Sequence, residues 1–196
     1  MTGSTRDDRS RRVAFVPFCL FCRAFQAEGL VKDGASHDGP VVKELLARDI
    51  NLVQMPCPEA EFEGVDRQPH GYDWYDRPEF RELCGRLADG VAARIKDLVT
   101  SGYEVCAVLG IEYSPSCAVK NQYMGRRGTV KQEGWFMAAL RERLVDAGLR
   151  VPLIGINRRG LKSTAERLAE LLDGVESGRE KKRLKTQDTR PKSHPN

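Results

Sequence analysis

The sequence predicts an α/β protein: a single Rossmann-like three-layer α/β/α domain with a mostly parallel sheet. Apolar segments of strand length alternate along the chain with amphipathic segments of helical period, in the order β-α-β-α-β-α-β-α. The segment from Val105 to Ile111 has no polar interruption, which is typical of a parallel strand covered on both faces. No G-x-G-x-x-G follows the first strand, which argues against a dinucleotide site of the usual kind.

Each element has a local signal. Strands are expected at residues 13–18, 49–53, 105–111 and 151–156, and helices at 40–48, 79–101, 132–147 and 161–172. Pro40 suits the first turn of a helix, and Gly102 follows the last apolar position of the longest one. The aromatic segment 60–78 is expected to be a packed loop. Segment 118–131, with two glycines and a basic cluster, is expected to be a loop near a ligand or in solvent.

Length and composition limit the class of protein. The chain of 196 residues fits one domain, predicted at residues 12–175 between an unstructured N-terminus, 1–11, and a basic unstructured tail, 176–196. Its start shows no signal-peptide profile despite six cysteines, so a cytoplasmic protein is expected rather than a secreted disulfide scaffold. The apolar runs are too short to span a membrane.

The formal charge of +4 belongs to the ends of the chain. Residues 1–12 carry a net charge of +2 and residues 176–196 carry +4, so the body between them is slightly acidic. A nucleic-acid site usually needs a basic patch on the folded surface, and the body offers none. The expectation is therefore against a nucleic-acid partner, although docking of the basic tail on RNA stays open as an alternative.

Three cysteines follow three of the predicted strands. Cys19 ends the first strand, Cys57 lies just beyond the second between two prolines, and Cys117 lies in a Ser-Pro-Ser-Cys loop after the third. Parallel strands end at one edge of a sheet, and ligands bind at that edge in open α/β folds. We therefore expect the three thiols to form a shared metal or cluster site. The alternative is three unrelated thiols.

The other cysteines have simpler interpretations. Cys84 lies in the apolar stripe of the longest helix and Cys106 lies within the central strand, so both are expected in the core. Cys22 forms a C-x-x-C pair with Cys19, which leaves a thiol–disulfide redox function open. His37, in a polar glycine-rich loop, is expected to be exposed.

Three thiolates suit a [4Fe-4S] cluster with one iron left open for substrate, since such clusters usually take four cysteines. Zinc remains possible by residue type, but separations of 38 and 60 residues differ from the close pairs of structural zinc sites. Glu59 follows Cys57 by two positions. In an extended chain its carboxylate would lie on the same side as that thiol, and the alternative is a charge in the first turn of a helix.

The chain resembles the 2-thiouracil desulfurase family, and more closely its related desulfidase branch, from about Arg12 to Leu172. The residues that carry the resemblance are Cys19-Leu20, Gln54-Met-Pro-Cys-Pro-Glu59, the run with Gly64, Arg67 and Tyr72-Asp73, Gly102-Tyr103, and Gly110-Ile-Glu-Tyr-Ser-Pro-Ser-Cys117. The resemblance implies a [4Fe-4S] cluster on Cys19, Cys57 and Cys117, with Glu59 and Ser114 assisting the reaction.

The expected function is therefore the removal of sulfur from a small thiolated pyrimidine-like substrate bound at the open iron. Two alternatives stand beside it. One is a redox protein that uses Cys19 and Cys22, and the other is a metal-binding module that docks on RNA through the basic tail. The sequence leaves the physiological substrate, the sulfur acceptor and the oligomeric state open.

Overall fold

The protein was analysed as a computed structural model that describes residues 8–124 and 127–188, with 175–188 as backbone only. Its main sheet has four parallel strands: β1 (Arg12–Pro17), β2 (Asn51–Met55), β3 (Glu104–Ile111) and β6 (Leu153–Ile156). They lie in the order β2-β1-β3-β6. The predicted parallel sheet is confirmed, and each of the four predicted strands is present.

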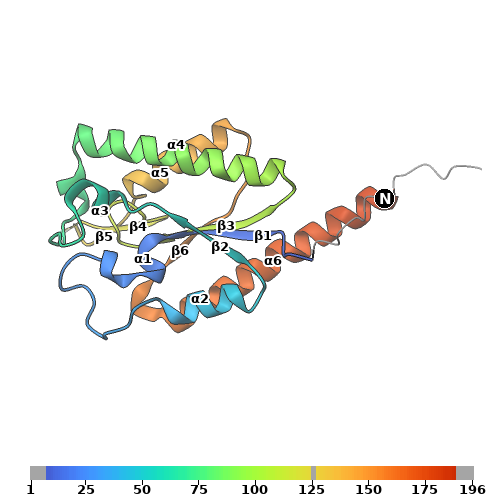
Figure 1. Cartoon of the computed structure of the whole chain (residues 1–196), viewed down its shortest axis with the longest axis horizontal. Helices are drawn as coiled ribbons and strands as arrows, with labels where there is room; N and C mark the ends of the chain where they lie inside the picture. Colours follow the sequence, from blue (N-terminus) through green and yellow to red (C-terminus); the bar gives the residue numbers. More distant parts are fainter. Residues whose placement is uncertain (1–7, 125–126, 189–196) are drawn as a thin grey trace, which may run out of the picture.

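Helices cover both faces of this sheet. The helices α4 (Pro78–Thr100) and α5 (Trp135–Asp146) pack together on one face, and α2 (Gly39–Leu46) and α6 (Leu161–Asp188) pack together on the other (Figure 1). This arrangement is the predicted three-layer α/β/α sandwich. It leaves the carboxyl ends of the strands uncovered by the long helices.

The core explains why the central strand lacks polar residues. In β3, every residue after Glu104 is buried, because α4 and α5 cover one face of the sheet and α2 and α6 cover the other. The long helix α4 contributes an apolar stripe at helical spacing: Phe80, Cys84, Ala88, Val91, Ala92 and Ile95. Burial of these side chains is the main source of stability for such a domain.

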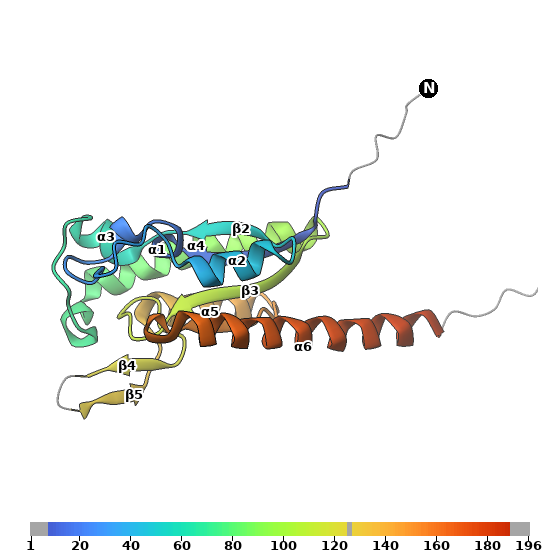
Figure 2. The same cartoon turned by 90° about the horizontal axis from the view of Figure 1, so that it is seen from below.

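Short elements crowd the carboxyl ends of the strands. They are α1 (Phe18–Phe21), η1 (Arg23–Phe25), α3 (Pro58–Glu63), η2 (Tyr72–Tyr75), η4 (Arg158–Gly160) and the antiparallel pair β4 (Asn121–Tyr123) and β5 (Thr129–Lys131). Figure 2 shows the β4–β5 pair projecting from this end of the molecule. We call this end the strand-end rim, defined by the residues that follow β1, β2, β3 and β6.

Two predicted loops are partly regular. Segment 60–78 was expected to be a loop, but it contains the end of α3 and all of η2. Pro58 begins α3 because its missing N–H is not needed at the first helical position. Segment 118–131 contains β4 and β5, whose three-residue strands are too short to show a clear alternation in sequence. Gly125 and Arg126, between them, lie outside the described residues.

The last helix is longer than predicted. It continues from Leu161 past the expected end at Leu172 to Asp188, into the segment that was expected to be an unstructured tail. Residues 1–7 and 189–196 lie outside the described part of the chain, so the division into a domain and two tails stays a prediction. Within the described residues, no helix combines the length and the apolar character needed to cross a membrane.

Candidate functional site

The structure places Cys19, Cys57 and Cys117 at the strand-end rim. Loss of solvent is the main cause that raises the pKa of Cys117, and its neighbours Cys57 and Cys19 add to it; for Cys57 loss of solvent again comes first, followed by Glu59, with a smaller contribution from Cys19. Side-chain contacts link two of these thiols to Glu59, because Arg67 Nη2 contacts both Cys57 Sγ and Glu59 Oε2, and Ser116 Oγ contacts both Cys117 Sγ and Glu59 Oε1. Cys57 and Cys117 therefore lie near one carboxylate, and the shared site of all three thiols stays a prediction.

Two of the three thiols sit on helices rather than in loops. Cys19 was expected at the end of the first strand, but it lies within α1, a single turn that follows β1 directly. Cys57, which lies between two prolines just beyond the second strand, is the N-cap residue of α3. Pro17 before α1 and Pro58 after Cys57 explain the difference, because a proline ring presets the dihedral angle found at helix starts. Each thiol is thus fixed at a helix start.

Burial dominates the chemistry of these thiols. Cys57 and Cys117 are 8% and 6% exposed, and Cys19 is partly exposed. Loss of solvent raises the pKa of all three, to about 12 for Cys57. As free thiols they hold their protons at neutral pH, so a positively charged partner would be needed to stabilise the thiolates.

Each sulfur accepts a hydrogen bond from a neighbouring side chain. Arg158 Nη2 lies 3.1 Å from Cys19 Sγ, and Arg67 Nη2 lies 3.8 Å from Cys57 Sγ. The hydroxyl of Ser116 lies 3.4 Å from Cys117 Sγ. Two guanidinium groups and one hydroxyl therefore face the sulfurs, a set of donors that stabilises negative charge on sulfur.

The loop that carries Cys117 is held by backbone hydrogen bonds. Ile111 N–H donates to the carbonyl of Cys117 at 3.0 Å, and Ala118 N–H donates to that of Ser114 at 3.1 Å. Tyr113, between the strand and this loop, has φ of 69°, a left-handed conformation that is uncommon for a side chain of its size. Such conformations persist where the surrounding structure enforces them, often at functional sites.

Two glycines allow this loop to fold back onto the sheet. A Cβ atom at Gly110, in β3, would lie 2.2 Å from the carbonyl oxygen of Cys117. A Cβ atom at Gly134, just before α5, would lie 2.4 Å from the carbonyl group of Ser116. The backbone of the loop is therefore packed directly against the backbone of two other elements, which fixes the position of Cys117.

Glu59 lies at the centre of the polar contacts. Its Oε1 accepts hydrogen bonds from Ser114 Oγ at 2.8 Å and from Ser116 Oγ at 2.6 Å. Its Oε2 lies 3.4 Å from Arg67 Nη2. The expectation of an extended chain at Glu59 was wrong, because this residue is in the first turn of α3. The helical alternative was correct for its position, yet the carboxylate still contacts Ser114.

Three residues of the site were not predicted. Ser116 is completely buried, and it links Glu59 to Cys117. Its place in the Ser-Pro-Ser-Cys segment was a signal that could have identified it. Arg158 and Asp38 had no such signal, since Arg158 is 139 positions from Cys19. Arg67 belonged to the motif run of the resemblance, but no role was assigned to it.

The remaining cysteines are separate from this site or marginal to it. Cys84 and Cys106 are each 1% exposed and belong to the hydrophobic core, as predicted. Cys22 is the C-cap residue of α1, and its thiol, like that of Cys19, is free. His37 is exposed, as predicted.

The described residues contain no group of three or more His, Cys, Asp or Glu side chains placed to hold one metal ion. The three thiols thus interact without forming a single-ion site in this conformation. A [4Fe-4S] cluster makes a different demand, because each cysteine binds a different iron of a larger inorganic core. The buried thiols and their hydrogen-bond donors are of the kind that such a cluster needs.

A cavity of about 290 Å³ lies beside Cys57. Its lining is Phe18, Phe25, Gln54, Met55, Pro56, Cys57, Ala60 and Glu61. The rings of Phe18 and Phe25 stack, with centroids 3.7 Å apart, so one wall of the cavity is aromatic. The side-chain amide of Gln54 adds a group that can both donate and accept hydrogen bonds.

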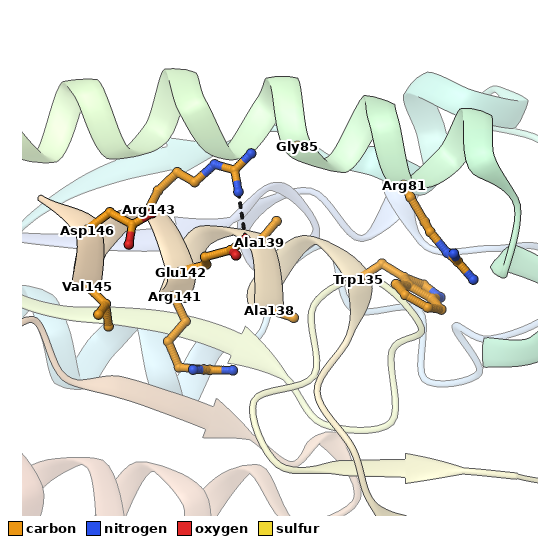
Figure 3. A pocket seen from close by; sticks show the side chains of 10 residues that line it. All are labelled: Arg81, Gly85, Trp135, Ala138, Ala139, Arg141, Glu142, Arg143, Val145 and Asp146. Carbon is orange, nitrogen blue, oxygen red and sulfur yellow. Dashed lines mark hydrogen bonds and ion pairs between the residues drawn. The ribbon is translucent and has the colours of Figure 1, made fainter.

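A larger cavity of about 530 Å³ lies elsewhere, in a groove between α4 and α5 (Figure 3). Its lining includes Arg81, Arg141 and Arg143 but no cysteine. Arg81 lies over the ring of Trp135, 4.5 Å from its centroid. We call this cavity the helix groove. Its residues are not among those that contact the three thiols.

No protein-family profile matches the chain. A search of curated proteins finds the uncharacterized protein MJ0003 of Methanocaldococcus jannaschii, 30% identical over 112 residues, which cover 57% of this chain and 70% of that protein. The chain belongs to the family of MJ0003. The description of that relative gives no activity, so the family is established without a function.

A search of solved structures finds the [4Fe-4S]-dependent thiouracil desulfidase TudS. The match covers 81% of this chain and 98% of TudS, with 18% sequence identity and a TM-score of 0.47. A likeness of this degree does not carry an activity from one protein to the other. The function must be argued from the strand-end rim itself.

Proposed function

We propose that the protein is an iron–sulfur-dependent desulfidase that removes sulfur from a small thiolated heterocycle such as 2-thiouracil. The observation that carries the proposal is that Glu59, which accepts hydrogen bonds from Ser114 and Ser116, is linked through Arg67 to the buried Cys57 and through Ser116 to the buried Cys117. A structural thiol cluster would not need a carboxylate beside it. The motif resemblance of the sequence supports the same function.

The cofactor in this proposal is a [4Fe-4S] cluster on Cys19, Cys57 and Cys117. When bound by three cysteines, such a cluster supplies an iron without a protein ligand, which can act as a Lewis acid toward the substrate sulfur. Arg67 and Arg158 support this assignment, because their guanidinium groups offset part of the negative charge of the thiolates.

The residues of the chain would then manage the water and its proton. Glu59 would act as the proton acceptor for the water, with its Oε1 oriented by the hydroxyl groups of Ser114 and Ser116. Ser114 would orient the attacking water or the substrate through its hydroxyl, and Ser116 would hold the carboxylate in place. Arg67 fixes the other oxygen of Glu59, so the carboxylate keeps one orientation.

The cavity beside Cys57 suits a small planar substrate. Its volume of about 290 Å³ can admit one ring of pyrimidine size. The stacked Phe18 and Phe25 offer a flat apolar wall, and Gln54 offers the hydrogen bonds that a pyrimidine edge requires. These features favour a small planar heterocycle as the substrate.

Anaerobic purification followed by iron and sulfide analysis tests the cofactor, and incubation with 2-thiouracil tests the activity. We expect about four irons and four sulfides per chain by the composition of the cluster, and release of uracil with sulfide. A colourless protein that contains one zinc per chain would overturn the proposal. A loaded protein that leaves 2-thiouracil intact would retain the cofactor and reject the substrate class.

A further inference from the structure

The end of β6 reaches the site through Arg158, a residue that no sequence motif indicates. We infer that Arg158, oriented by Asp38, is a positioning residue that holds the sulfur of Cys19 at the strand-end rim. The inference rests on the proposed function only where it concerns a bound cluster. The contact between Arg158 and Cys19 can be tested without one.

One guanidinium group makes all of the contacts. Arg158 Nη2 lies 2.9 Å from the carbonyl oxygen of Cys19 and 3.1 Å from its Sγ. Arg158 Nε lies 2.8 Å from Asp38 Oδ2. Because the guanidinium fork is planar and rigid, the bond to Asp38 also fixes the direction of the nitrogen that meets Cys19. The backbone and the side chain of Cys19 are thus held by the same nitrogen.

Asp38 is itself firmly placed. It is completely buried, and its backbone N–H donates to the carbonyl of Leu20 at 2.9 Å. Its second oxygen, Oδ1, lies 3.6 Å from Arg23 Nε. A buried carboxylate is costly unless cations or donors surround it. Here Arg158 donates to Oδ2 and Arg23 lies near Oδ1, which has no hydrogen bond among the described residues. Asp38 therefore ties α1, which carries Cys19, to the end of β6.

The turn that carries Arg158 is also fixed. Asn157 Oδ1 accepts from the N–H of Arg159 at 3.0 Å, and the carbonyl of Asn157 accepts from Thr164 Oγ1 at 3.1 Å. These bonds fix the backbone on both sides of Arg158. An arginine that only neutralised Asp38 would not also have to contact the sulfur of Cys19. The contact with that sulfur therefore indicates a role toward Cys19.

The role has two measurable consequences for a bound cluster. Loss of the guanidinium would free the Cys19 sulfur to move, so iron would be released faster. It would also remove a positive charge and a hydrogen bond from beside the cluster, and both stabilise the more negative, reduced form. The reduction potential should therefore become more negative when Arg158 is replaced by a neutral residue.

The main test compares three variants of the loaded protein. For Arg158→Gln we expect iron release to a chelator to be about 10- to 100-fold faster, the usual range for the loss of such a supporting contact, with a more negative potential. Arg158→Lys keeps the charge but cannot contact Asp38 and Cys19 through a planar fork, so it should fall between Gln and the native protein. Arg159→Gln is the matched control and should behave like the native protein.

A second variant guards against a folding defect. Arg158→Gln leaves Asp38 with one cation fewer, which can unfold the chain, so the double variant Arg158→Gln with Asp38→Asn replaces the buried ion pair by two neutral amides. It should fold, as judged by thermal unfolding, and still release iron faster than the native protein. If the folded variants release iron at the native rate and have the native reduction potential, the inference is overturned.

A double-mutant cycle in the metal-free protein tests this inference independently of the proposed function. Arg158→Lys, Cys19→Ala and the combination are compared by their free energies of unfolding. Non-additive effects support the contact, and additive effects overturn it. If the native protein holds no iron–sulfur cluster, the proposed function fails, and this cycle still decides whether Arg158 positions Cys19.

Discussion

The strand-end rim and the helix groove both contain arginines, but they use them differently. In the helix groove, Arg141 forms hydrogen bonds of 2.8 and 2.9 Å with the two oxygens of Glu133, and Arg143 pairs with Asp89 at 2.9 Å. At the rim, Arg67 and Arg158 contact carboxylates and cysteine sulfurs at the same time. In the helix groove, which is the larger of the two cavities, Arg141 and Arg143 therefore pair with carboxylates rather than with cysteine sulfurs.

This difference shows that the groups an arginine contacts indicate a functional site better than the size of the cavity does. A surface arginine paired with a carboxylate contributes little and offers little to a ligand. Arg67 is different, because its side chain is 3% exposed. Its Nε and Nη1 atoms have no hydrogen-bond partner within the described part of the chain. A buried cation of this kind is costly unless it serves a nearby negative group.

The largest effect is expected from loss of a rim thiol. Cys57→Ser should lose most of the iron and all turnover, because a serine hydroxyl is a poor ligand for iron–sulfur clusters. Cys22→Ser should keep both, since Cys22 is not among the predicted ligands. Iron content and turnover of 2-thiouracil measure the two variants. The redox hypothesis predicts the reverse pattern, in which Cys22→Ser is inactive and Cys57→Ser is tolerated.

Loss of the rim carboxylate should come next. Glu59→Gln keeps the volume of the side chain and an oxygen that can accept from the serine hydroxyls, but it removes the negative charge beside Arg67 and the ability to take a proton. We expect turnover to fall by about 10²- to 10⁴-fold, the usual contribution of a group that transfers a proton, while the iron content stays unchanged. Glu79→Gln, in the first turn of α4, is the matched control. Near-normal turnover at full iron content would remove Glu59 from the mechanism.

A smaller effect is expected from the backbone that supports Cys117. Gly110→Ala would bring a methyl group against the carbonyl of Cys117, so the free energy of unfolding should fall by about 1–3 kcal/mol, as for other overpacked sites. Gly90→Ala, on α4 where a Cβ meets nothing within 4 Å, should instead raise it by about 0.4–1 kcal/mol. Urea unfolding measures both. Equal stability of the two variants would show that the loop can move freely.

Much of the fold could be predicted because its signals are local. The uninterrupted apolar segment of β3 and the stripe of α4 each lie within one stretch of sequence, and the rule that parallel strands end together then brings three cysteines to the rim. The start of α3 was missed because Pro58 and the residues after it suit a loop or a helical turn equally well. The helical geometry of α3 changes how the backbone reaches Glu59, but the carboxylate of Glu59 still contacts Ser114.

The contacts that complete the site could not be predicted in the same way. Arg158 and Cys19 are separated by 139 positions, and Asp38 lies in a segment with no periodic pattern. Their meeting depends on β6 lying beside β3 and on the packing of the loop before α2. Sequence periodicity specifies which face of an element is buried, but it does not specify which charged groups meet across the ends of a sheet.

The smallest effect is expected in the helix groove. Arg141 and Glu133 are partly exposed, at 50% and 21%, so their pair is screened by solvent. Arg141→Gln should lower the free energy of unfolding by less than about 1 kcal/mol, the usual limit for a surface pair, and it should leave iron content and turnover unchanged. A double-mutant cycle with Glu133→Gln isolates the pair. A clear loss of turnover in Arg141→Gln, at native stability, would break the comparison, because the helix groove would then belong to the functional site despite its paired arginines.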